Sequence, residues 1–139
     1  MTRLGASCGG PVVAVVAAVV EENGAFLVTR RPEGVHLAGL WEFPGGKIDA
    51  GETHARALKR EILEELGTDV HVHDLLFHTT HPYPERSVAL YFYRCTLADA
   101  PFAVLGQQMR WVPRRELADL GFPPADQQLI RLLAASDVP

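Results

Sequence analysis

The segment from Thr53 to Leu66 most constrains the fold, because its pattern of apolar residues fits an amphipathic helix. Apolar side chains recur every three or four positions along one stripe, which consists of Ala55, Leu58, Ile62 and Leu66. Thr53 can accept a hydrogen bond from a free N–H at the start of the helix, and Gly67 stands where a helix stops. We therefore expect a helix whose apolar stripe packs against the rest of the chain.

The same helix gathers three carboxylates at positions that are neighbours on one face. They belong to Glu61, Glu64 and Glu65. Like charges at this spacing destabilise a helix by about 0.2–0.5 kcal/mol per pair. Either this face is solvated, as most charged runs are, or a hard divalent cation such as Mg²⁺ binds it. Upstream, Gly45 and Gly46 would let the backbone approach a ligand closely, and Glu52 stands just before the helix.

Strand and helix patterns alternate along the rest of the chain. Runs rich in β-branched and aromatic residues predict strands near 12–20, 25–30, 69–78, 87–95 and 109–112, with a short extended piece at 41–48. Shorter helices are predicted at 113–120 and 123–135, and residues 1–10 are predicted to be a tail. One sheet covered by helices, in a single domain over residues 11–139, is the expected architecture.

Charge and cysteine content exclude several classes of protein. The formal net charge is -4 and the chain has no basic block, which argues against a protein that binds along a nucleic-acid backbone. The apolar run at 11–20 is too short to span a bilayer. Two cysteines, Cys8 and Cys95, are too few for a disulfide framework. We expect a cytoplasmic protein, a monomer or homodimer, without a nucleic-acid or membrane partner.

From Gly46 to Thr68 the chain reads G-x5-E-x7-R-E-I-x-E-E-x-G-T, which resembles the Nudix box of the Nudix hydrolases. The polar and glycine positions of that box are all present, as Gly46, Glu52, Arg60, Glu61, Glu64, Glu65 and Gly67. Thr68 departs from it, because an aliphatic residue is usual there. The segments "TRRPEGVHLAGLWEFPGGKID" and "FPPAD" resemble the MutT-type branch of the family.

The resemblance implies an α+β Nudix fold, an α/β/α sandwich with a mixed central sheet. It also implies Mg²⁺-dependent hydrolysis of (deoxy)nucleoside triphosphates to the monophosphate and pyrophosphate, removing oxidised or non-standard nucleotides such as 8-oxo-dGTP. Mn²⁺ is the expected substitute for Mg²⁺. Alternative readings are a CTP or modified-pyrimidine pyrophosphohydrolase, an enzyme for dinucleoside polyphosphates or nucleoside diphosphate sugars, and a Nudix module that binds a nucleotide without hydrolysis.

Roles in catalysis follow from the resemblance, residue by residue. Glu61, Glu65 and the backbone carbonyl of Gly45 are expected to bind the metal. Glu64 would be a further ligand or would position the attacking water. Glu52 would support the first metal or contribute to a second, and Arg60 would hold a glutamate in place. Relatives commonly carry another glutamate where this chain has Leu105, so either the box suffices, another acid substitutes, or the rate is lower.

Substrate contacts are also implied by the resemblance. The expected substrate-binding residues are Arg31, His36, Glu42, Phe43, Pro44, Tyr83, Arg86 and Asp126. Among them, Tyr83 and Arg86 belong to a loop that closes on the base. Asp126 stands where relatives acting on oxidised guanine carry asparagine. An ionised aspartate only accepts hydrogen bonds, whereas asparagine also donates, so the preferred base is open between 8-oxoguanine and a pyrimidine.

Overall fold

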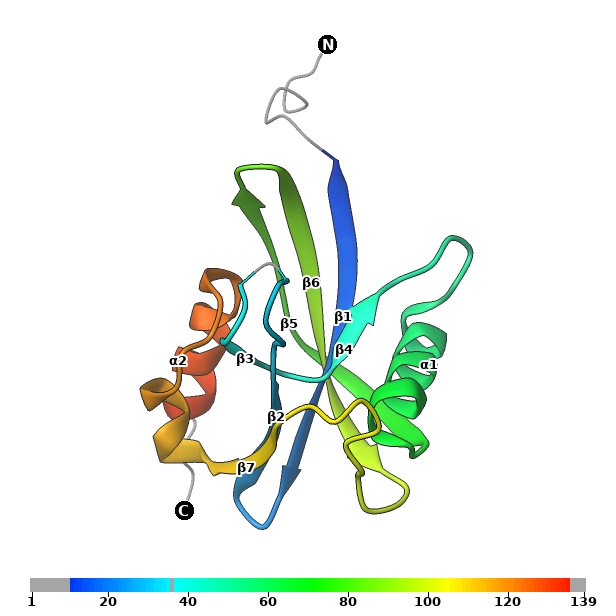
Figure 1. The fold of residues 1–139 in the computed structure, drawn as a ribbon, viewed down its shortest axis with the longest axis vertical. Coiled ribbons are helices and arrows are strands. Elements are labelled where there is room, and N and C mark those ends of the chain that lie inside the picture. The colour runs from blue at the N-terminus through cyan, green and yellow to red at the C-terminus, as the bar shows by residue number, and fades with distance from the viewer. Residues whose placement is uncertain (1–10, 36, 136–139) are drawn as a thin grey trace.

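A computed structural model describes residues 11–35 and 37–135 (Figure 1). Within these residues the chain forms a seven-stranded mixed sheet. Its strands are β1 (Val12–Glu22), β2 (Ala25–Arg30), β3 (Trp41–Glu42), β4 (Gly45–Lys47), β5 (Val70–Tyr83), β6 (Arg86–Leu97) and β7 (Met109–Pro113). The strand order is β3-β2-β1-β6-β5, with β4 paired to β1 and β7 paired to β2.

Strand β1 joins the two halves of this sheet. Along one edge it pairs in parallel with β6, from Val12 opposite Ser87 to Val20 opposite Cys95. Along its other edge it pairs antiparallel with β4 and then, at its end, with β2. Both faces of β1 are covered, which explains why its sequence is almost continuously apolar rather than alternating.

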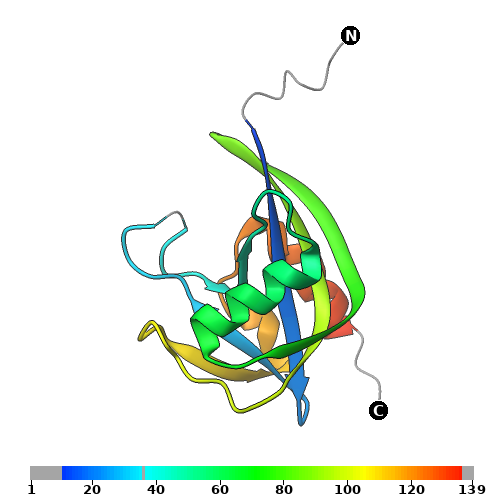
Figure 2. The same ribbon diagram turned by 90° about the vertical axis from the view of Figure 1, so that its right-hand side faces the viewer.

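Helices cover both faces of the sheet, as Figures 1 and 2 show. Helix α1 (His54–Leu66) packs on one face, where Leu58, Ile62 and Leu66 join a buried cluster with residues of β1. Helix α2 (Gln127–Ala135) and the 3₁₀ helix η2 (Arg114–Asp119) lie on the opposite face, in a second cluster. The predicted mixed sheet between helices is confirmed. No helix in the described ranges is long and apolar enough to cross a membrane.

The ends of α1 agree with the sequence prediction, but its apolar stripe differs at one position. The Thr53 hydroxyl accepts a hydrogen bond from Arg56 N at 3.1 Å, and Gly67 has the left-handed φ of 69°. Ala55 is exposed, and Ala57, which is fully buried, takes its place against the sheet. The prediction that Ala55 belongs to the stripe was therefore wrong, because the helix turns its 57–58 edge toward β1.

Thr68, the polar residue at a usually aliphatic position, is buried and fully engaged. Its hydroxyl donates to the carbonyl of Asp69 at 3.0 Å and accepts from the N–H of Asp99 at 3.0 Å. A buried hydroxyl costs little when it is hydrogen-bonded. The departure from the family pattern is thus accommodated by the segment that follows β6.

The larger differences from the predicted element boundaries lie at β5 and at the two C-terminal helices. The strand expected to end at residue 78 continues to Tyr83, so the expected loop is a hairpin with only Pro84 and Glu85 at its turn. Pro82 is tolerated because β5 is an edge strand, where a missing N–H breaks no ladder. Both C-terminal helices begin as 3₁₀ turns after prolines, η2 at Arg114 and η3 (Pro124–Asp126) before α2.

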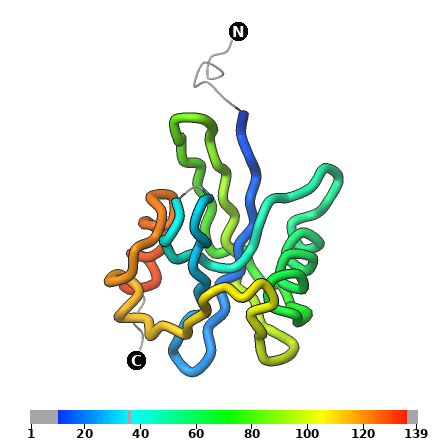
Figure 3. Tube along the Cα trace, in the orientation of Figure 1, coloured from blue at the N-terminus to red at the C-terminus, as the bar shows by residue number. Residues whose placement is uncertain are grey.

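The segment between β6 and β7 passes the C-terminal end of α1, as the trace in Figure 3 shows. Phe102 N donates to the carbonyl of Leu66 at 2.9 Å, and Val104 N donates to the carbonyl of Glu65 at 3.1 Å. These are carbonyls that the last turn of a helix leaves without intrahelical partners. The segment therefore caps α1 on the side of the acidic residues.

Candidate active site

Two glycines place strand β4 between β1 and the acidic face of α1. A Cβ on Gly45 would lie only 2.8 Å from the Cα of Ala17 in β1. A Cβ on Gly46 would overlap the carboxylate of Glu61. Neither position can carry a side chain without displacing backbone or a carboxylate. Gly45 and Gly46 are therefore required by close approach rather than by a turn.

Glu61 and Glu65 form a carboxylate pair against β4. Burial, a hydrogen bond shared with Glu61, and the charges of Glu61 and Glu42 raise the pKa of Glu65 far above that of an ordinary carboxyl. A hydrogen bond from the backbone of Gly45 opposes this shift of the pKa. Two neighbouring carboxylates repel each other when both are ionised, so the pair favours binding of a cation, whose positive charge removes this repulsion.

Arg60 organises the acids around this pair. Its guanidinium donates twice to Glu52, from Nε at 2.8 Å and from Nη2 at 2.9 Å, and once to Glu61 Oε2 at 2.8 Å. The bonds from Arg60, assisted by the N–H of Asp49, lower the pKa of Glu52 to about 2. Glu64 is more distant, 3.7 Å from Arg60, with 60% of its side chain exposed.

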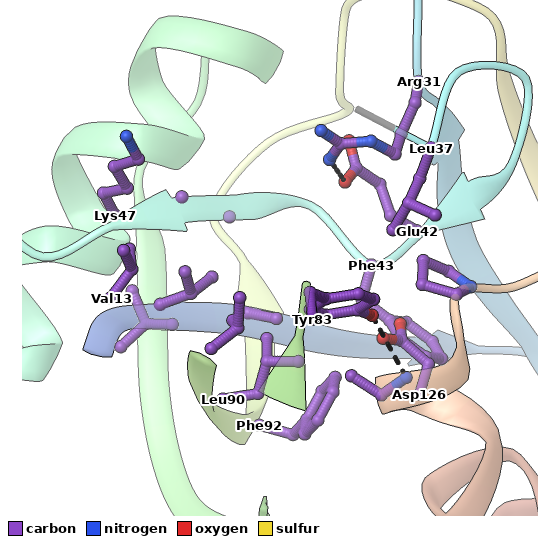
Figure 4. Close-up of a pocket in the computed structure, with 18 of the residues that line it drawn as sticks. Val13, Arg31, Leu37, Glu42, Phe43, Lys47, Tyr83, Leu90, Phe92 and Asp126 are labelled. Atoms are coloured by element: carbon purple, nitrogen blue, oxygen red, sulfur yellow. Dashed lines mark hydrogen bonds and ion pairs between the residues drawn. The ribbon is translucent and has the colours of Figure 1, made fainter. Parts of the chain in front are cut away.

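A cavity of about 370 Å³ opens beside the carboxylate pair (Figure 4). Its apolar wall comes from β1, from β6 and from the link between β3 and β4, and it includes Val13, Val15, Phe43, Val88, Leu90 and Phe92. Gly45, Gly46 and Glu65 line it on the side of α1. One continuous space therefore connects an apolar chamber to the buried acids, the shape expected of a site for a flat apolar group with a charged extension.

The polar end of this cavity holds Arg31, Glu42 and Asp126. Arg31 Nη1 lies 2.7 Å from Glu42 Oε1, in an ion pair that Figure 4 shows above Phe43. Burial nonetheless raises the pKa of Glu42 above its ordinary value, against the opposing effect of Arg31. Burial, with the nearby charge of Glu42, raises the pKa of Asp126 to about 7. The pKa of Asp126 thus lies close to neutral pH, whereas the prediction from the sequence considered only the hydrogen bonds of its ionised form.

Tyr83 connects the two walls of the polar end. It is the last residue of β5, and its hydroxyl accepts a hydrogen bond from the backbone N–H of Ala125 at 3.4 Å. Arg86, across the hairpin turn, also lines the cavity. The expected closing loop is therefore the end of the β5–β6 hairpin, which contacts the turn that carries Asp126.

The structure brings most of the predicted site residues together. Those that line the cavity are Arg31, Glu42, Phe43, Gly45, Glu65, Tyr83, Arg86 and Asp126. Glu52, Arg60, Glu61 and Glu64 lie next to it on the side of α1. Pro44 is buried and does not line the cavity, and its carbonyl accepts a hydrogen bond from Ala18 N at 2.8 Å. Its place beside the substrate stays a prediction. His36 lies outside the described residues.

The sequence reading missed several residues of the cavity. They are Val13, Val15, Leu37, Lys47, Val88, Leu90 and Pro123. The alternation of apolar residues in the strand at 87–95 could have marked one of its faces as a cavity wall. That this face joins β1 around one cavity depends on the parallel pairing of β1 with β6, which no local pattern encodes.

A second cavity of about 380 Å³ adjoins the first. The two share Arg31, Glu42 and Glu65. Leu105 and Gln107, from the segment that caps α1, contribute to the wall of this second space. Glu65 therefore lies at the junction of both cavities.

A mixed sheet with a glycine strand against an acidic helix defines a Nudix domain, and the family model for the NUDIX domain matches residues 15–132. The chain belongs to the Nudix family. Within that family it is similar to the 8-oxo-dGTP diphosphatase of Haemophilus influenzae, with 38% identity over 124 residues that cover 88% of this chain and 91% of that protein. It is also similar to the CTP pyrophosphohydrolase of Escherichia coli, with 46% identity over 44% of this chain and 45% of that protein.

A solved structure supports the same placement. The solution structure of MutT, a Nudix hydrolase from methicillin-resistant Staphylococcus aureus 252, has a TM-score of 0.75 and 35% identity, covering 91% of this chain and 98% of that one. The expectation of a MutT-type Nudix hydrolase, an enzyme that acts on phosphoric anhydrides, is confirmed. The alternative hypothesis, a Nudix module that binds a nucleotide without hydrolysis, is correspondingly disfavoured.

Nudix hydrolases generally depend on a divalent metal, and the donor atoms here fit one. Pro44 and Ile48 hydrogen-bond β1, and Gly46 lies opposite Val16 in the same alternation, so Gly45 and Lys47 turn their carbonyls away from β1. The bond from Arg60 Nη2 to Lys47 O at 3.0 Å shows this for Lys47. By this alternation the carbonyl of Gly45 faces the Glu61–Glu65 pair. In the described residues no three acidic, histidine or cysteine side chains are grouped for a metal. A backbone carbonyl beside two carboxylates is an oxygen donor of the kind that hard divalent cations bind.

Proposed function

We propose that this enzyme hydrolyses nucleoside triphosphates to the monophosphate and pyrophosphate, using Mg²⁺ or Mn²⁺, and removes oxidised nucleotides of the 8-oxo-dGTP type. One observation carries the proposal. The apolar cavity of about 370 Å³ ends in hydrogen-bonding groups on one side and runs without interruption to Gly45, Gly46 and Glu65 on the other. A base in the chamber would thus extend its phosphates toward the buried acids.

In this proposal the acidic residues and Arg60 have separate roles in the reaction. Glu61, Glu65 and the carbonyl of Gly45 hold the cation. The chemistry that a bound divalent ion supplies is neutralisation of phosphate oxygens and activation of the attacking water. Arg60 fixes Glu61 and Glu52 in place, and the more exposed Glu64 adds a ligand or orients the water.

Binding of the nucleotide falls to the residues of the cavity. Arg31 is a donor for phosphate or sugar oxygens at the junction of the two cavities. Phe43 and the apolar wall exclude water from the base. Arg86 can donate to a carbonyl oxygen on the base, and Tyr83 can stack against its ring. Water exclusion around the acids strengthens their hold on charged groups.

Asp126 supports an oxidised purine as the preferred base. With a pKa of about 7, it is protonated in a large share of molecules at neutral pH. A neutral carboxylic acid both donates and accepts a hydrogen bond, as asparagine does in relatives that act on oxidised guanine. The difference between aspartate and asparagine at this position is therefore smaller than the sequence suggests.

The same residue favours one second candidate, a CTP-type pyrimidine substrate. In its ionised share Asp126 only accepts, which suits the exocyclic amino group of cytosine. The local similarity to a CTP pyrophosphohydrolase points the same way. The site can bind both bases if Asp126 is protonated with an oxidised guanine and ionised with a cytosine.

The test is Mg²⁺-dependent pyrophosphate release from a panel of 8-oxo-dGTP, dGTP, CTP, 5-hydroxy-dCTP, Ap4A and ADP-ribose. We expect the highest kcat/KM for 8-oxo-dGTP and the next for the cytosine nucleotides. Turnover of Ap4A or ADP-ribose alone would overturn the proposal, and a preference for 5-hydroxy-dCTP would select the second candidate.

A variant series tests the metal-binding role of the acids. Glu65→Gln keeps the shape of the side chain and removes a charged ligand, so we expect kcat to fall at least about 100-fold with the fold retained in circular dichroism. Glu116→Gln, at an exposed position on η2 over the opposite face, is the matched control and should keep full activity. Full activity in Glu65→Gln would remove Glu65 from the ligand set.

A further inference from the structure

Gln107 is attached to the catalytic helix at the residue that carries the buried acid. Its side-chain Nε2 donates to the backbone carbonyl of Glu65 at 2.9 Å. That carbonyl also accepts from Val104 N at 3.1 Å, so two donors from one segment converge on it. Glu65 is the last residue but one of α1, where a helix has no intrahelical donors for its carbonyls.

The same side chain also fixes its own segment. Its Oε1 accepts from the N–H of Leu105 at 3.0 Å, and the turn that returns the chain is made by Gly106 at a φ of 74°. Leu105 itself is 70% exposed and its side chain contributes to the wall of the second cavity. The side-chain amide of Gln107 therefore makes two hydrogen bonds, one to α1 and one within its own segment. The neighbouring Leu105 side chain is largely exposed to solvent.

The hydrogen bond between Gln107 and the Glu65 carbonyl affects the placement of the acid rather than the fold as a whole. The hydrogen bonds from the segment reach the backbone carbonyl of Glu65. Its carboxyl group lies at the junction of the two cavities, paired with Glu61. A terminal turn of a helix frays easily when its carbonyls lack partners. Movement of that turn would shift the Glu65 carboxyl, while Leu58 and Ile62 of the buried stripe, which precede the turn, would stay in contact with the sheet.

We propose that Gln107 is a positioning residue for the metal-binding carboxylate of Glu65, acting through the Glu65 carbonyl. This inference rests on the proposed function, because it takes Glu65 as a ligand. In this role Gln107 neither binds the metal nor transfers a proton. Its contribution is to set the place of one ligand, and groups that orient metal ligands typically affect metal affinity by about 10- to 100-fold.

The test compares Gln107→Met with Gln108→Met. Methionine has a similar length and no amide, so it keeps packing and removes both hydrogen bonds. Gln108 is the matched control, since it lies in the same segment and the same cavity but its Oε1 accepts from Arg30 Nη1 at 2.9 Å. Mn²⁺ binding to the free protein, measured by electron paramagnetic resonance, gives a readout that is independent of turnover.

For Gln107→Met we expect Mn²⁺ affinity and kcat to fall about 10-fold, with KM for the nucleotide at saturating metal within about twofold of the wild type. For Gln108→Met we expect wild-type values. Wild-type Mn²⁺ affinity in Gln107→Met would overturn the proposal, and so would an equal loss in both variants, which would mark a general effect of the segment.

Glu65→Gln, measured in parallel, separates this inference from the proposed function. If Glu65→Gln is inactive and Gln107→Met matches the wild type, the positioning role alone fails. If Glu65→Gln is fully active, the ligand set fails and the positioning role fails with it. If Gln107→Met melts more than about ten degrees below the wild type, its role is structural and the proposal is also overturned.

Discussion

Replacing Asp126 with asparagine should change how the stability of the protein depends on pH. Asp126 is only 5% exposed and lies at the polar end of the cavity, facing Glu42 and Arg31. Burial and the charge of Glu42 raise its pKa from 3.8 to about 7. In the unfolded chain, where neither effect acts, the carboxyl titrates near its ordinary value.

The sign and the size of the effect follow from proton linkage. Between about pH 4 and about pH 7 the unfolded chain has released the proton of Asp126 and the folded chain still holds it, so stability falls as the pH rises. Each pH unit in that window costs about 1.4 kcal/mol, and a difference of about three units gives about 4 kcal/mol as an upper value. Asparagine does not titrate, so Asp126→Asn should lose this slope.

Urea unfolding of both proteins across about pH 4 to pH 8 provides the assay. The free energy of unfolding of Asp126→Asn, relative to the wild type, should rise through this window and level off above about pH 7. Any cost of the asparagine amide itself shifts the whole curve and leaves its slope unchanged. Asp119→Asn, the same change at an exposed position on η2, is the control. A difference between Asp126→Asn and the wild type that stays flat with pH would refute the reasoning.

Three further substitutions test the site. Gly46→Ala would drive a Cβ into the carboxylate of Glu61, so kcat should fall at least about 10-fold with the circular dichroism unchanged; an unaffected kcat would contradict the close approach. Tyr83→Phe removes the hydroxyl that accepts from Ala125 N and should cost about 0.5–1.5 kcal/mol in urea unfolding, whereas unchanged stability would show that this bond contributes nothing. Arg60→Met removes the hydrogen bonds that hold Glu52 and Glu61, and steady-state kinetics should show kcat/KM lowered about 10- to 100-fold. A smaller loss would mean that Arg60 contributes no more than a surface ion pair does.

The sequence by itself determined the parts of this protein that depend on local patterns. Spacing of apolar residues, the cap at Thr53 and the stop at Gly67 predict α1. The structure confirms the helix and both of its ends, with Ala57 in place of Ala55 in the buried stripe. The Nudix box falls within one stretch of chain, from Gly46 to Thr68, so its acids and glycines could be read together. Since the strand, the turn and the helix follow one another directly, their residues could be assigned from local patterns.

Only the tertiary structure decided which distant residues meet these elements. The pKa of Asp126 depends on burial against Glu42, and the hold of Gln107 on Glu65 joins residues 42 positions apart. Neither contact has a signal in local sequence, because each depends on how the sheet pairs and on which segment returns past α1. Desolvation and hydrogen bonding act over a few ångströms in space, so protonation state and ligand placement are set by the fold.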